Sequence, residues 1–584
     1  MKFIFRSIAR YKWAIALAIF LKLLGTMFEL LLPYILEHMV DHVVPSGQLG
    51  PVIFWGLMMF VAAVLCRQFN VAANRKAIFN AHRVSYDVRQ ALFEKTINLS
   101  GHQFDFFGLP SLISRMTSDS YNVQSSVQQL QSLCVRAPIM LVGGLIMTLS
   151  MDRHLAMILV VMVPFLLAVV LFVSSRGIPL FTAVQQRLDT VVRIMRENIT
   201  GIRVVKALSK TEYEKRRFAQ ANREMVDSDI RASSIMAIPG PFMQLSLNVG
   251  LVLVIILGGR RVNAGEMQPG VILAFLTYFN MITMGVMGLN RIFMTMSRAS
   301  ASANRIASVL KTESDQHILP PAEAKQPHGK EFIRFEHVNF SYHTGEGDGS
   351  DFAGGKREQV LSDIDFALKK GESLGIIGPT GCGKTTIINL LMRFYDVEDG
   401  GVFVDGRDVR TYEKKELRGK FGVVFQNDMV FQDTLRQNID FGRIIPENKV
   451  LGAVEDAMAA EYISTLDDGL DYEATIKGAN LSGGQKQRLL VARALAGTPE
   501  ILILDDSSSA LDYKTDAAMR RAIESHHGDS TLIMIAQRVS SVMGMTNILV
   551  MDNGQCIGYG SHQHLLETCP AYREIYDVQM GAIG

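Results

Sequence analysis

The sequence has few cysteines and almost no net charge, and each shortage excludes a class of protein. Its 584 residues include five cysteines, an odd number without disulfide or zinc-site spacing, which indicates reduced thiols. Lysine and arginine total 59 against 57 aspartate and glutamate, so a formal charge of +2 predicts no surface for nucleic acid. Charged residues make up only 20% of this chain, and its mean hydropathy is +0.18. A chain this apolar is not an ordinary soluble enzyme.

The hydrophobic residues are concentrated before residue 300. Six apolar stretches there are long enough to cross a bilayer core, which takes about 20 helical residues. They begin near Trp13, Pro51, Val135, Leu155, Ile235 and Pro269. The first stretch is too long for a cleaved signal and lacks a small-residue cleavage site, so we expect a membrane span there.

Basic residues indicate the orientation of these spans. The first twelve residues hold four basic and no acidic side chains, and the segments after the second and fourth spans are rich in lysine and arginine. The positive-inside rule then predicts a cytoplasmic N-terminus. Arg153, Arg260 and Arg261 fall in loops on the other side and oppose this orientation mildly. Short loops and the absence of a targeting segment favour a bacterial plasma (inner) membrane.

The polar segments after the second and fourth spans keep apolar residues near helical spacing. We therefore expect the spans to continue as long helices into the cytoplasm. Turns are predicted at the tips of these helices, at Ser111–Asp119 and Lys210–Glu214. Both tips are candidate contacts with the second half of the chain.

The composition changes in the middle of the chain. A polar, proline-bearing stretch indicates a domain boundary, which divides the chain into a membrane domain at 1–315, a linker at 316–330 and a second domain at 331–584. Short β-rich runs alternate with helical stretches in that domain, which is typical of an α/β fold with a mainly parallel sheet. Residues 343–358, rich in glycine and aspartate, are predicted to form a flexible surface loop.

A glycine-rich loop joins a predicted strand to a helix that begins at Lys384. Backbone N–H groups at such a helix N-terminus wrap the phosphates of a nucleotide, and glycine lets the backbone approach them. Lys384 would reach the β- and γ-phosphates, and the Thr385 hydroxyl would bind Mg²⁺. Asp505 ends the apolar run ILIL and is the expected Mg²⁺ carboxylate. The expected nucleotide-binding residues of this segment are Gly378, Thr380, Gly381, Cys382, Gly383, Lys384, Thr385 and Thr386.

With these motifs after six spans, the chain resembles a half-transporter of the ATP-binding cassette (ABC) exporter family over essentially its full length. The resemblance implies that Tyr342 stacks on adenine and that Gln426 lies near Mg²⁺ and the attacking water. The run LSGGQ at 481–485 matches the family signature, and Ser509 to Asp512 resembles the D-loop. In this family two nucleotide-binding domains meet head to tail, so the signature of one chain completes the ATP site of the other. The signature residues expected to contact nucleotide are Ser482, Gly483, Gly484 and Gln485.

Two positions depart from the family pattern. Asp506 stands where a self-sufficient motor carries glutamate, and Gln537 stands where it carries histidine. A general base must lie within about 2.6 to 3.2 Å of the proton it takes, and aspartate is one methylene shorter. Gln537 can donate a hydrogen bond but cannot carry a proton. These changes resemble the degenerate subunit of heterodimeric bacterial multidrug exporters, so we expect a chain that binds ATP and Mg²⁺ and hydrolyses poorly.

The resemblance implies a second half-transporter that carries the catalytic glutamate and histidine. Two alternatives stay open: a homodimeric exporter with slow hydrolysis, and an ATP-gated channel or regulator without net transport. The first alternative makes Asp506 the base of both sites, with a water molecule bridging the missing length.

The cargo is the least determined feature. Lys22 and Glu29 in the first span would either bind a polar substrate or pair with neighbouring helices. Methionines in the sixth span suit a drug-like or lipid-like amphipathic cargo, although ordinary helix packing is the more frequent explanation of such methionines. The same ambiguity holds for three aromatic residues of this span. The residues concerned are Met281, Met284, Met287, Phe275, Tyr278 and Phe279.

Overall fold

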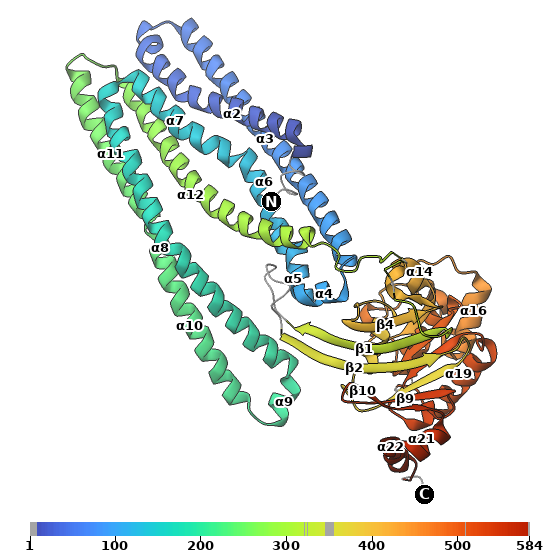
Figure 1. Ribbon diagram of the computed structural model, residues 1–584. Coiled ribbons are helices and arrows are strands. Elements are labelled where there is room, and N and C mark those ends of the chain that lie inside the picture. Colours follow the sequence, from blue (N-terminus) through green and yellow to red (C-terminus); the bar gives the residue numbers. More distant parts are fainter. Residues whose placement is uncertain (1–8, 321, 324, 345–355, 508–509, 582–584) are drawn as a thin grey trace. The chain divides into compact units, whose positions relative to one another are not determined.

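The computed structural model describes residues 9–320, 322–323, 325–344, 356–507 and 510–581. The chain divides into two compact units. The first contains Met1–Lys95 and Pro110–Lys311, and the second contains Thr96–Leu109 and Thr312–Gly584 (Figure 1). The proposed domain limits at residues 315 and 330 stay a prediction.

The first unit is built of long helices. Its helices in chain order are α2 (Lys12–His38), the π-helix η1 (Met39–Val43), η2 (Val44–Ser46), α3 (Leu49–Ile97), α5 (Leu109–Ser114), the π-helix η3 (Arg115–Asp119), α6 (Ser120–Gln131), α7 (Leu133–Met151), α8 (Arg153–Thr200), α9 (Ile202–Ala207), α10 (Thr211–Ala237), α11 (Pro239–Asn263) and α12 (Pro269–Lys311). Helices α8 and α10 lie side by side along their length (Figure 1).

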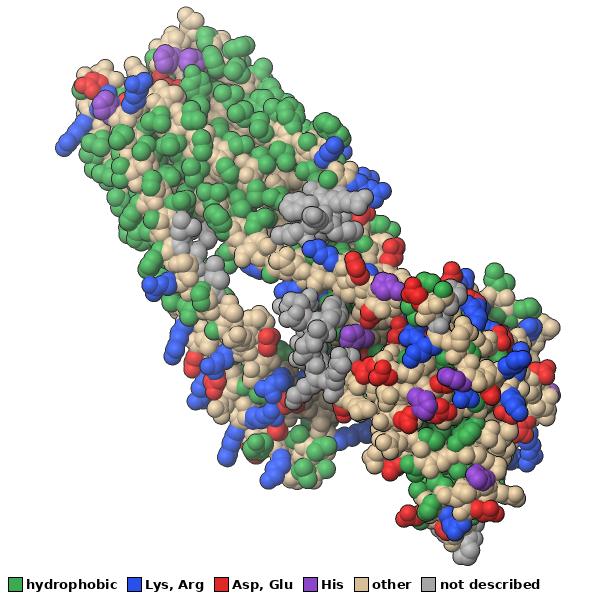
Figure 2. Space-filling model, in the orientation of Figure 1, with side chains coloured by type: hydrophobic (Ala, Val, Ile, Leu, Met, Phe, Trp, Pro, Cys, Tyr) green, Lys and Arg blue, Asp and Glu red, His purple; other side chains and the backbone are tan. Residues whose placement is uncertain are grey.

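Five helical stretches of the described residues are long and apolar enough to cross a membrane. They are Lys12–Ser46, Leu49–Ile97, Leu109–Met151, Thr211–Asn263 and Pro269–Lys311. The fourth predicted span falls on α8, whose apolar part in the described chain is the shorter Arg153–Val169. Hydrophobic side chains cover much of the visible surface of this unit (Figure 2), as a lipid-facing bundle requires.

Both charged side chains of the first span are paired with neighbouring helices. Lys22 Nζ donates to Asn70 Oδ1 at 2.8 Å and to Asn74 Oδ1 at 3.2 Å. Glu29 accepts from Arg136 Nη2 at 2.7 Å. Pairing of this kind offsets the cost of charge at membrane depth, so these residues are explained by helix packing.

The aromatic and methionine residues of the sixth span, on α12, differ in how exposed they are. Phe275, Tyr278 and Phe279 are at most 1% exposed, so they belong to the packed core. Met284 and Met287 are 66% and 49% exposed. Packing therefore accounts for the aromatic residues but not for these two methionines.

The second unit holds two sheets. The strands are β1 (Ile333–Thr344), β2 (Lys356–Leu368), β3 (Ser373–Ile377), β4 (Asp399–Val404), β5 (Arg407–Asp408), β6 (Phe421–Val424), β7 (Ile501–Asp505), β8 (Thr531–Ile535), β9 (Asn547–Asp552) and β10 (Gln555–Gly560). One sheet is antiparallel with the order β2-β1-β4-β5, and the other has the order β10-β9-β3-β8-β7-β6 and is parallel except at β10. Strand β7 reads as an unbroken apolar run because both its faces are covered.

Helices surround these sheets. They are α4 (Gly101–Phe107), α13 (Lys384–Leu391), η4 (Val409–Thr411), α14 (Lys414–Gly419), α15 (Leu435–Asp440), α16 (Glu447–Asp456), α17 (Ala460–Ser464), η5 (Gly469–Asp471), η6 (Ile476–Gly478), α18 (Gly483–Ala496), α19 (Tyr513–His526), α20 (Val539–Val542), α21 (His562–Thr568) and α22 (Pro570–Met580). The α/β fold expected after the membrane domain is confirmed.

The segment after the second span differs from the prediction. Residues 111–119, expected to turn, are helical in α5 and η3. Their hydroxyl groups bond to carbonyls of the preceding turn, as Thr117 Oγ1 does to Ile113 O at 2.8 Å, so these polar residues continue the helix. The chain instead breaks at Gly108, whose φ of 70° favours glycine. The second turn lies at 208–210, so only Lys210 of its predicted range takes part.

Two further predictions fall partly outside the described residues. The ends of the expected loop at 343–358 are strand residues of β1 and β2, and residues 345–355 are not described. Ser509 of the expected D-loop also lies outside the described chain.

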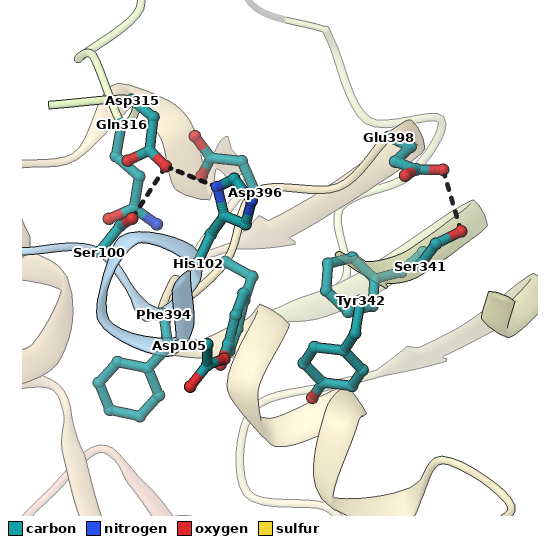
Figure 3. Close-up of a pocket in the computed structure, with 12 residues that line it drawn as sticks. Ser100, His102, Asp105, Asp315, Gln316, Ser341, Tyr342, Phe394, Asp396 and Glu398 are labelled. Atoms are coloured by element: carbon teal, nitrogen blue, oxygen red, sulfur yellow. Dashed lines mark hydrogen bonds and ion pairs between the residues drawn. The ribbon is translucent and has the colours of Figure 1, made fainter. Parts of the chain in front are cut away.

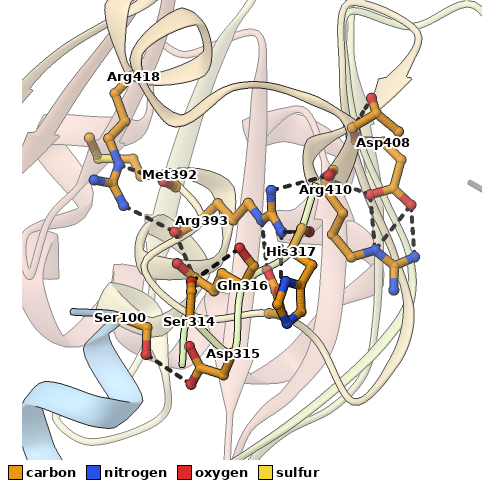
Figure 4. A network of polar contacts seen from close by, with 12 residues as sticks. Ser100, Ser314, Asp315, Gln316, His317, Met392, Arg393, Asp408, Arg410 and Arg418 are labelled. Atoms are coloured by element: carbon orange, nitrogen blue, oxygen red, sulfur yellow. Dashed lines mark hydrogen bonds and ion pairs between the residues drawn. The ribbon is translucent and has the colours of Figure 1, made fainter. Parts of the chain in front are cut away.

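Residues just after α12 are fixed to the second unit by a buried arginine (Figure 4). Arg393 is 1% exposed. Its guanidinium donates to His317 O at 2.7 Å, to Arg410 O at 3.1 Å and to Asp396 Oδ1 at 2.8 Å. Gln316 Nε2 donates to Arg393 O at 3.2 Å. The start of the predicted linker is therefore ordered by hydrogen bonds.

Candidate functional site

The glycine-rich loop connects β3 to α13 as predicted from the sequence. Gly381 and Gly383 have φ angles of 87° and 98°, which side chains rarely adopt. A Cβ on Gly378 would lie 2.2 Å from Met551 O, and one on Gly383 would lie 2.6 Å from Leu361 Cδ2. Conformation and close packing thus both require glycine in this loop.

Lys384 begins α13 and folds back over the loop. Its Nζ donates to Gly378 O at 2.8 Å and to Pro379 O at 2.7 Å. Cys382 is buried in the loop, 3.8 Å from this Nζ, and burial raises the pKa of its thiol. The loop therefore presents an ammonium group and a helix N-terminus, which suit a phosphate.

Thr385 and Asp505 meet at the end of β7. Thr385 Oγ1 donates to Asp505 Oδ2 at 2.9 Å, and Asp505 is 2% exposed. Burial raises the pKa of Asp505, and the charge of Asp506 adds to this, while the Thr385 hydroxyl opposes it. A hydroxyl and a carboxylate are the hard oxygen ligands that Mg²⁺ prefers, so these two residues fit that ion.

The two departures from the family pattern contact each other. Gln537 Nε2 donates to Asp506 Oδ2 at 3.1 Å. Asp506 has a φ of 52°, and its backbone N–H donates to Ile535 O at 3.0 Å, which fixes the residue after β7. Burial raises the pKa of the Asp506 carboxyl, against the opposing charge of Lys384.

These residues line one cavity of about 280 Å³. Its lining consists of Tyr342, Val360, Thr380, Gly381, Gly383, Lys384, Thr385, Thr386, Gln426, Asp505, Asp506, Ile535 and Gln537. The Tyr342 hydroxyl lies 3.3 Å from Thr386 Oγ1 and accepts from Asn389 Nδ2 at 3.2 Å. Gly378 and Cys382 belong to the loop but do not line the cavity.

The signature forms the start of α18. Ser482 caps this helix through a reciprocal pair, in which Gln485 N donates to Ser482 Oγ at 3.3 Å and Ser482 N donates to Gln485 Oε1 at 2.8 Å. A Cβ on Gly484 would lie 3.2 Å from Ala510 O. The structure does not bring Ser482, Gly483, Gly484 or Gln485 to the described lining of the phosphate-loop cavity of the same chain.

Sequence reasoning missed Gln487, two residues beyond the signature. Its Nε2 donates to Asp506 O at 3.1 Å, and its Oε1 accepts from Ala510 N at 3.2 Å. Gln487 thus joins the signature helix to the residue after β7. Motif spacing gives no signal for this contact, because it depends on how α18 packs.

A second, smaller cavity of about 190 Å³ lies between α4 and residues of β1 in the same unit (Figure 3). Tyr395 OH donates to Asp105 of α4 at 2.5 Å, and its ring meets Tyr342 edge to face at 5.2 Å. Burial and the Asp105 contact raise the pKa of Tyr395. A chain of contacts therefore runs from the phosphate-loop cavity to α4.

Asp315 holds the other end of α4. It accepts from Ser100 Oγ at 2.9 Å and lies 3.3 Å from His102 Nδ1 (Figure 3). Burial raises the pKa of Asp315, but its hydrogen bonds to His102 and Ser100 outweigh burial and hold that pKa below its usual range.

Long apolar helices followed by a phosphate-loop α/β unit define an ATP-coupled membrane transporter. Residues 15–286 match the family described as "ABC transporter transmembrane region", and residues 361–509 match the family described as "ABC transporter". The chain belongs to the ABC transporter family, as an exporter-type half-transporter.

Several relatives match most of the chain. An uncharacterized ABC transporter ATP-binding protein of Mycobacterium tuberculosis is 34% identical and covers 97% of this chain and 96% of its own length. YfiB of Bacillus subtilis, also described as an uncharacterized ABC transporter ATP-binding protein, is 32% identical and covers 98% of each chain. A fatty acid ABC transporter ATP-binding/permease protein of Mycobacterium bovis is 30% identical over 89% of this chain and 80% of its own.

The fold is that of a solved bacterial Atm1-family ABC exporter with ATP bound. The two structures superpose with a TM-score of 0.78 at 23% sequence identity and cover 98% of this chain and 99% of the other. A helical membrane domain of the ABC exporter type followed by an α/β nucleotide-binding domain is thereby confirmed as the architecture, with five of the six expected spans found as full-length apolar helices in the described chain.

Proposed function

We propose that this chain is the slow-hydrolysing half of a heterodimeric ABC exporter, which moves amphipathic cargo outward. The contact between Asp506 and Gln537 carries the proposal. A carboxylate that accepts a hydrogen bond from a neighbouring amide has one position fewer for an attacking water, and aspartate is already one methylene short of that water.

Nucleotide binding in this site rests on residues that keep their family identity. Lys384 and the N-terminus of α13 would hold the phosphates, and Tyr342 would stack on the adenine. Mg²⁺, which would neutralise charge on the β- and γ-phosphates, would be held by Thr385, Asp505 and Gln426. ATP bound here should persist because binding groups are present while the base is weak.

The partner chain would supply the faster site. Ser482, Gly484 and Gln485 would complete that site across the dimer, and the partner would contribute the glutamate and histidine that this chain lacks. The intact capping of α18 by Ser482 supports this role, since it leaves the signature presented at a helix N-terminus.

The proposed cargo is drug-like or lipid-like. Met284 and Met287 are exposed on the sixth span, and flexible thioether side chains accommodate varied apolar shapes. A relative is described as a fatty acid transporter, and fatty acids are amphipathic. The chain would lie in a bacterial inner membrane, and its basic N-terminal segment favours an N-terminus and nucleotide-binding domain in the cytoplasm.

The subunit composition tests the proposal. We would isolate the complex from native membranes through this chain and identify its partner by mass spectrometry. A second half-transporter with glutamate and histidine at the two departing positions supports the heterodimer. Recovery of this chain alone as a dimer contradicts it and makes Asp506 the base of a slow homodimer.

Restoring the family residues gives an independent test. In the unchanged complex, ATP should stay trapped in the site of this chain. The double change Asp506→Glu with Gln537→His should let that site hydrolyse its ATP. Photolabelling with an azido-ATP analogue reads each subunit separately. Unchanged trapping on this chain would contradict a degenerate site, and loss of ATP-driven transport with trapping intact in both forms would favour a gated channel.

A further inference from the structure

The first unit contains a cavity of about 350 Å³ between α6 and α12, which shares no described lining residue with the phosphate-loop cavity. Its lining consists of Tyr121, Asn122, Ser125, Gln129, Met287, Arg291, Met294, Thr295 and Arg298. The residues from α12 recur every three or four positions, so they occupy one face of that helix. No acidic residue is among the described residues that line the cavity.

The two arginines are the charged groups of this cavity. Arg291 and Arg298 lie two turns apart, about 10 Å along α12. Within the described part of the chain neither forms an ion pair or a hydrogen bond that would neutralise it. The next arginine along the helix, Arg305, instead pairs with Asp119. The cavity is therefore a concentration of positive charge without an internal counterion.

The remaining lining residues offer both polar and apolar contacts. Gln129 Oε1 is buried and has no hydrogen-bond partner in the described structure. Met287 and Met294 supply apolar surface from α12, and the Tyr121 ring supplies it from α6. A ligand with a charged head and an apolar body matches this mixture.

The walls of the cavity are held in place by polar contacts that lie just beyond Arg298 along α12. Asn122 Nδ2 donates to Ser302 Oγ at 3.0 Å, and Arg305 Nε donates to Asp119 Oδ2 at 2.9 Å. These contacts tie α6 and the preceding η3 to α12 and leave the cavity preformed between α6 and α12. A preformed site avoids part of the ordering cost of binding.

The position along α12 fits an amphipath at a membrane surface. Arg291 lies 22 residues after Pro269, where α12 begins, which is about 33 Å along the helix. A hydrocarbon core is about 30 Å thick, so a span that starts at Pro269 brings Arg291 near the edge of the core and Arg298 about 10 Å further into the headgroup region. Met287 and Met284 precede Arg291 along α12, on the side toward the core, and both are exposed.

We propose that this cavity binds an anionic amphipath, with a carboxylate, sulfonate or phosphate on Arg291 and Arg298 and its hydrocarbon on Met287 and Met294. Guanidinium groups bind such oxyanions through paired N–H donors. The cavity would be the site where the exported cargo is loaded, and this role rests on the exporter function proposed above. The same chemistry is offered by a free amphipath and by the headgroup of an anionic lipid.

The test uses the isolated complex in nanodiscs of phosphatidylcholine, without nucleotide. The probes are 11-(dansylamino)undecanoate and its methyl ester, which share the apolar body and differ in charge. We expect the acid to bind, and Arg291→Gln with Arg298→Gln to weaken it about 10- to 100-fold, as loss of charged hydrogen bonds predicts. The ester should bind equally to both forms. Arg231→Gln, at an exposed arginine of α10 outside the cavity, should change neither affinity.

Each remaining outcome has one meaning. Arg291→Lys with Arg298→Lys should retain much of the acid's affinity, because charge is kept while paired donors are lost. Nanodiscs with phosphatidylglycerol separate the two sources, since competition by this lipid assigns the site to a headgroup and its absence assigns it to the free amphipath. Equal affinity for acid and ester, or undiminished acid binding in the glutamine variant, would overturn the proposal. ATP binding of each variant is measured in parallel. If the complex binds the acid but shows no ATP-driven transport of it, the exporter function is contradicted while the binding site is supported.

Discussion

Replacing Asp506 by asparagine distinguishes the heterodimeric mechanism from the homodimeric one. The substitution keeps the side-chain size and leaves an oxygen to accept the hydrogen bond that Gln537 donates at 3.1 Å, so it removes the charge and basicity of the carboxylate while its shape is kept. Losing a positioned base costs about 10²- to 10⁴-fold. If this site contributes little turnover, the ATPase rate of the whole complex should change less than about twofold, because the rate comes from a site with a base of its own.

The matched change is Ser482→Ala, which strikes the site completed by this chain's signature. We expect at least about a tenfold fall in ATPase rate, since a donor to the transferring phosphoryl group is lost. Loss of an N-cap alone costs about 1 kcal/mol, and Ser561→Ala removes such a cap from α21 as the control. Steady-state phosphate release measures all three. A fall of a hundredfold or more in Asp506→Asn, equal to that in Ser482→Ala, would refute the reasoning.

Four further changes test other features of the second unit. Gly383→Ala should abolish nucleotide binding, measured by calorimetry, because its φ is 98° and the new Cβ would lie 2.6 Å from Leu361. Arg393→Met should lower the free energy of unfolding by about 3 to 5 kcal/mol in denaturant titrations, because buried carbonyls and Asp396 lose their donor; unchanged stability would contradict the network. Alkylation of Cys382 should be blocked by ATP and should accelerate only at more alkaline pH than for an exposed cysteine, since burial raises its pKa. The pKa of Asp315 is lowered, so its stabilising effect is present above the pKa of the unfolded state and lost as pH falls through the folded value; thermal melts of Asp315→Asn should lack that acid dependence.

The parts of the fold that the sequence predicts best are those with one strong period or motif. Long apolar runs predict the spans because a bilayer demands them, and strand, glycine loop and helix predict the phosphate site in order. The turn expected at Ser111–Asp119 fails because hydroxyl groups there bond within the helix, while Ser100 and Gly108 delimit α4. Capping and breaking residues were present in the sequence, but a serine-rich stretch is equally compatible with a turn and a helix.

Contacts between distant segments account for what sequence reasoning could not predict. Lys22 and Glu29 are settled only by the side chains that face them, Asn70 and Arg136. The same holds for Gln487, whose bonds to Asp506 and Ala510 depend on packing of α18. Spacing along the chain shows which chemical groups are present. Tertiary packing decides which of these groups pair with one another.

The contacts around α4 connect the nucleotide cavity with a helix that follows α3 in the sequence. The Tyr342 ring belongs to the cavity that would receive adenine, and Tyr395 connects it edge to face with Asp105 of α4. Helix α4 begins four residues after α3 ends, and α3 continues a predicted span. Tyr395→Phe removes the hydroxyl but keeps the ring, so it should leave ATP affinity unchanged and lower the ATPase stimulation that a transported amphipath produces. The control is Asn389→Ala, which removes the hydrogen bond that Asn389 donates to the Tyr342 hydroxyl and leaves the contact between Tyr395 and Asp105 in place. If Tyr395→Phe lowered ATP affinity and basal hydrolysis as much as stimulation, the contact between Tyr395 and Asp105 would contribute to nucleotide binding itself. It would then not transmit the binding of nucleotide to α4.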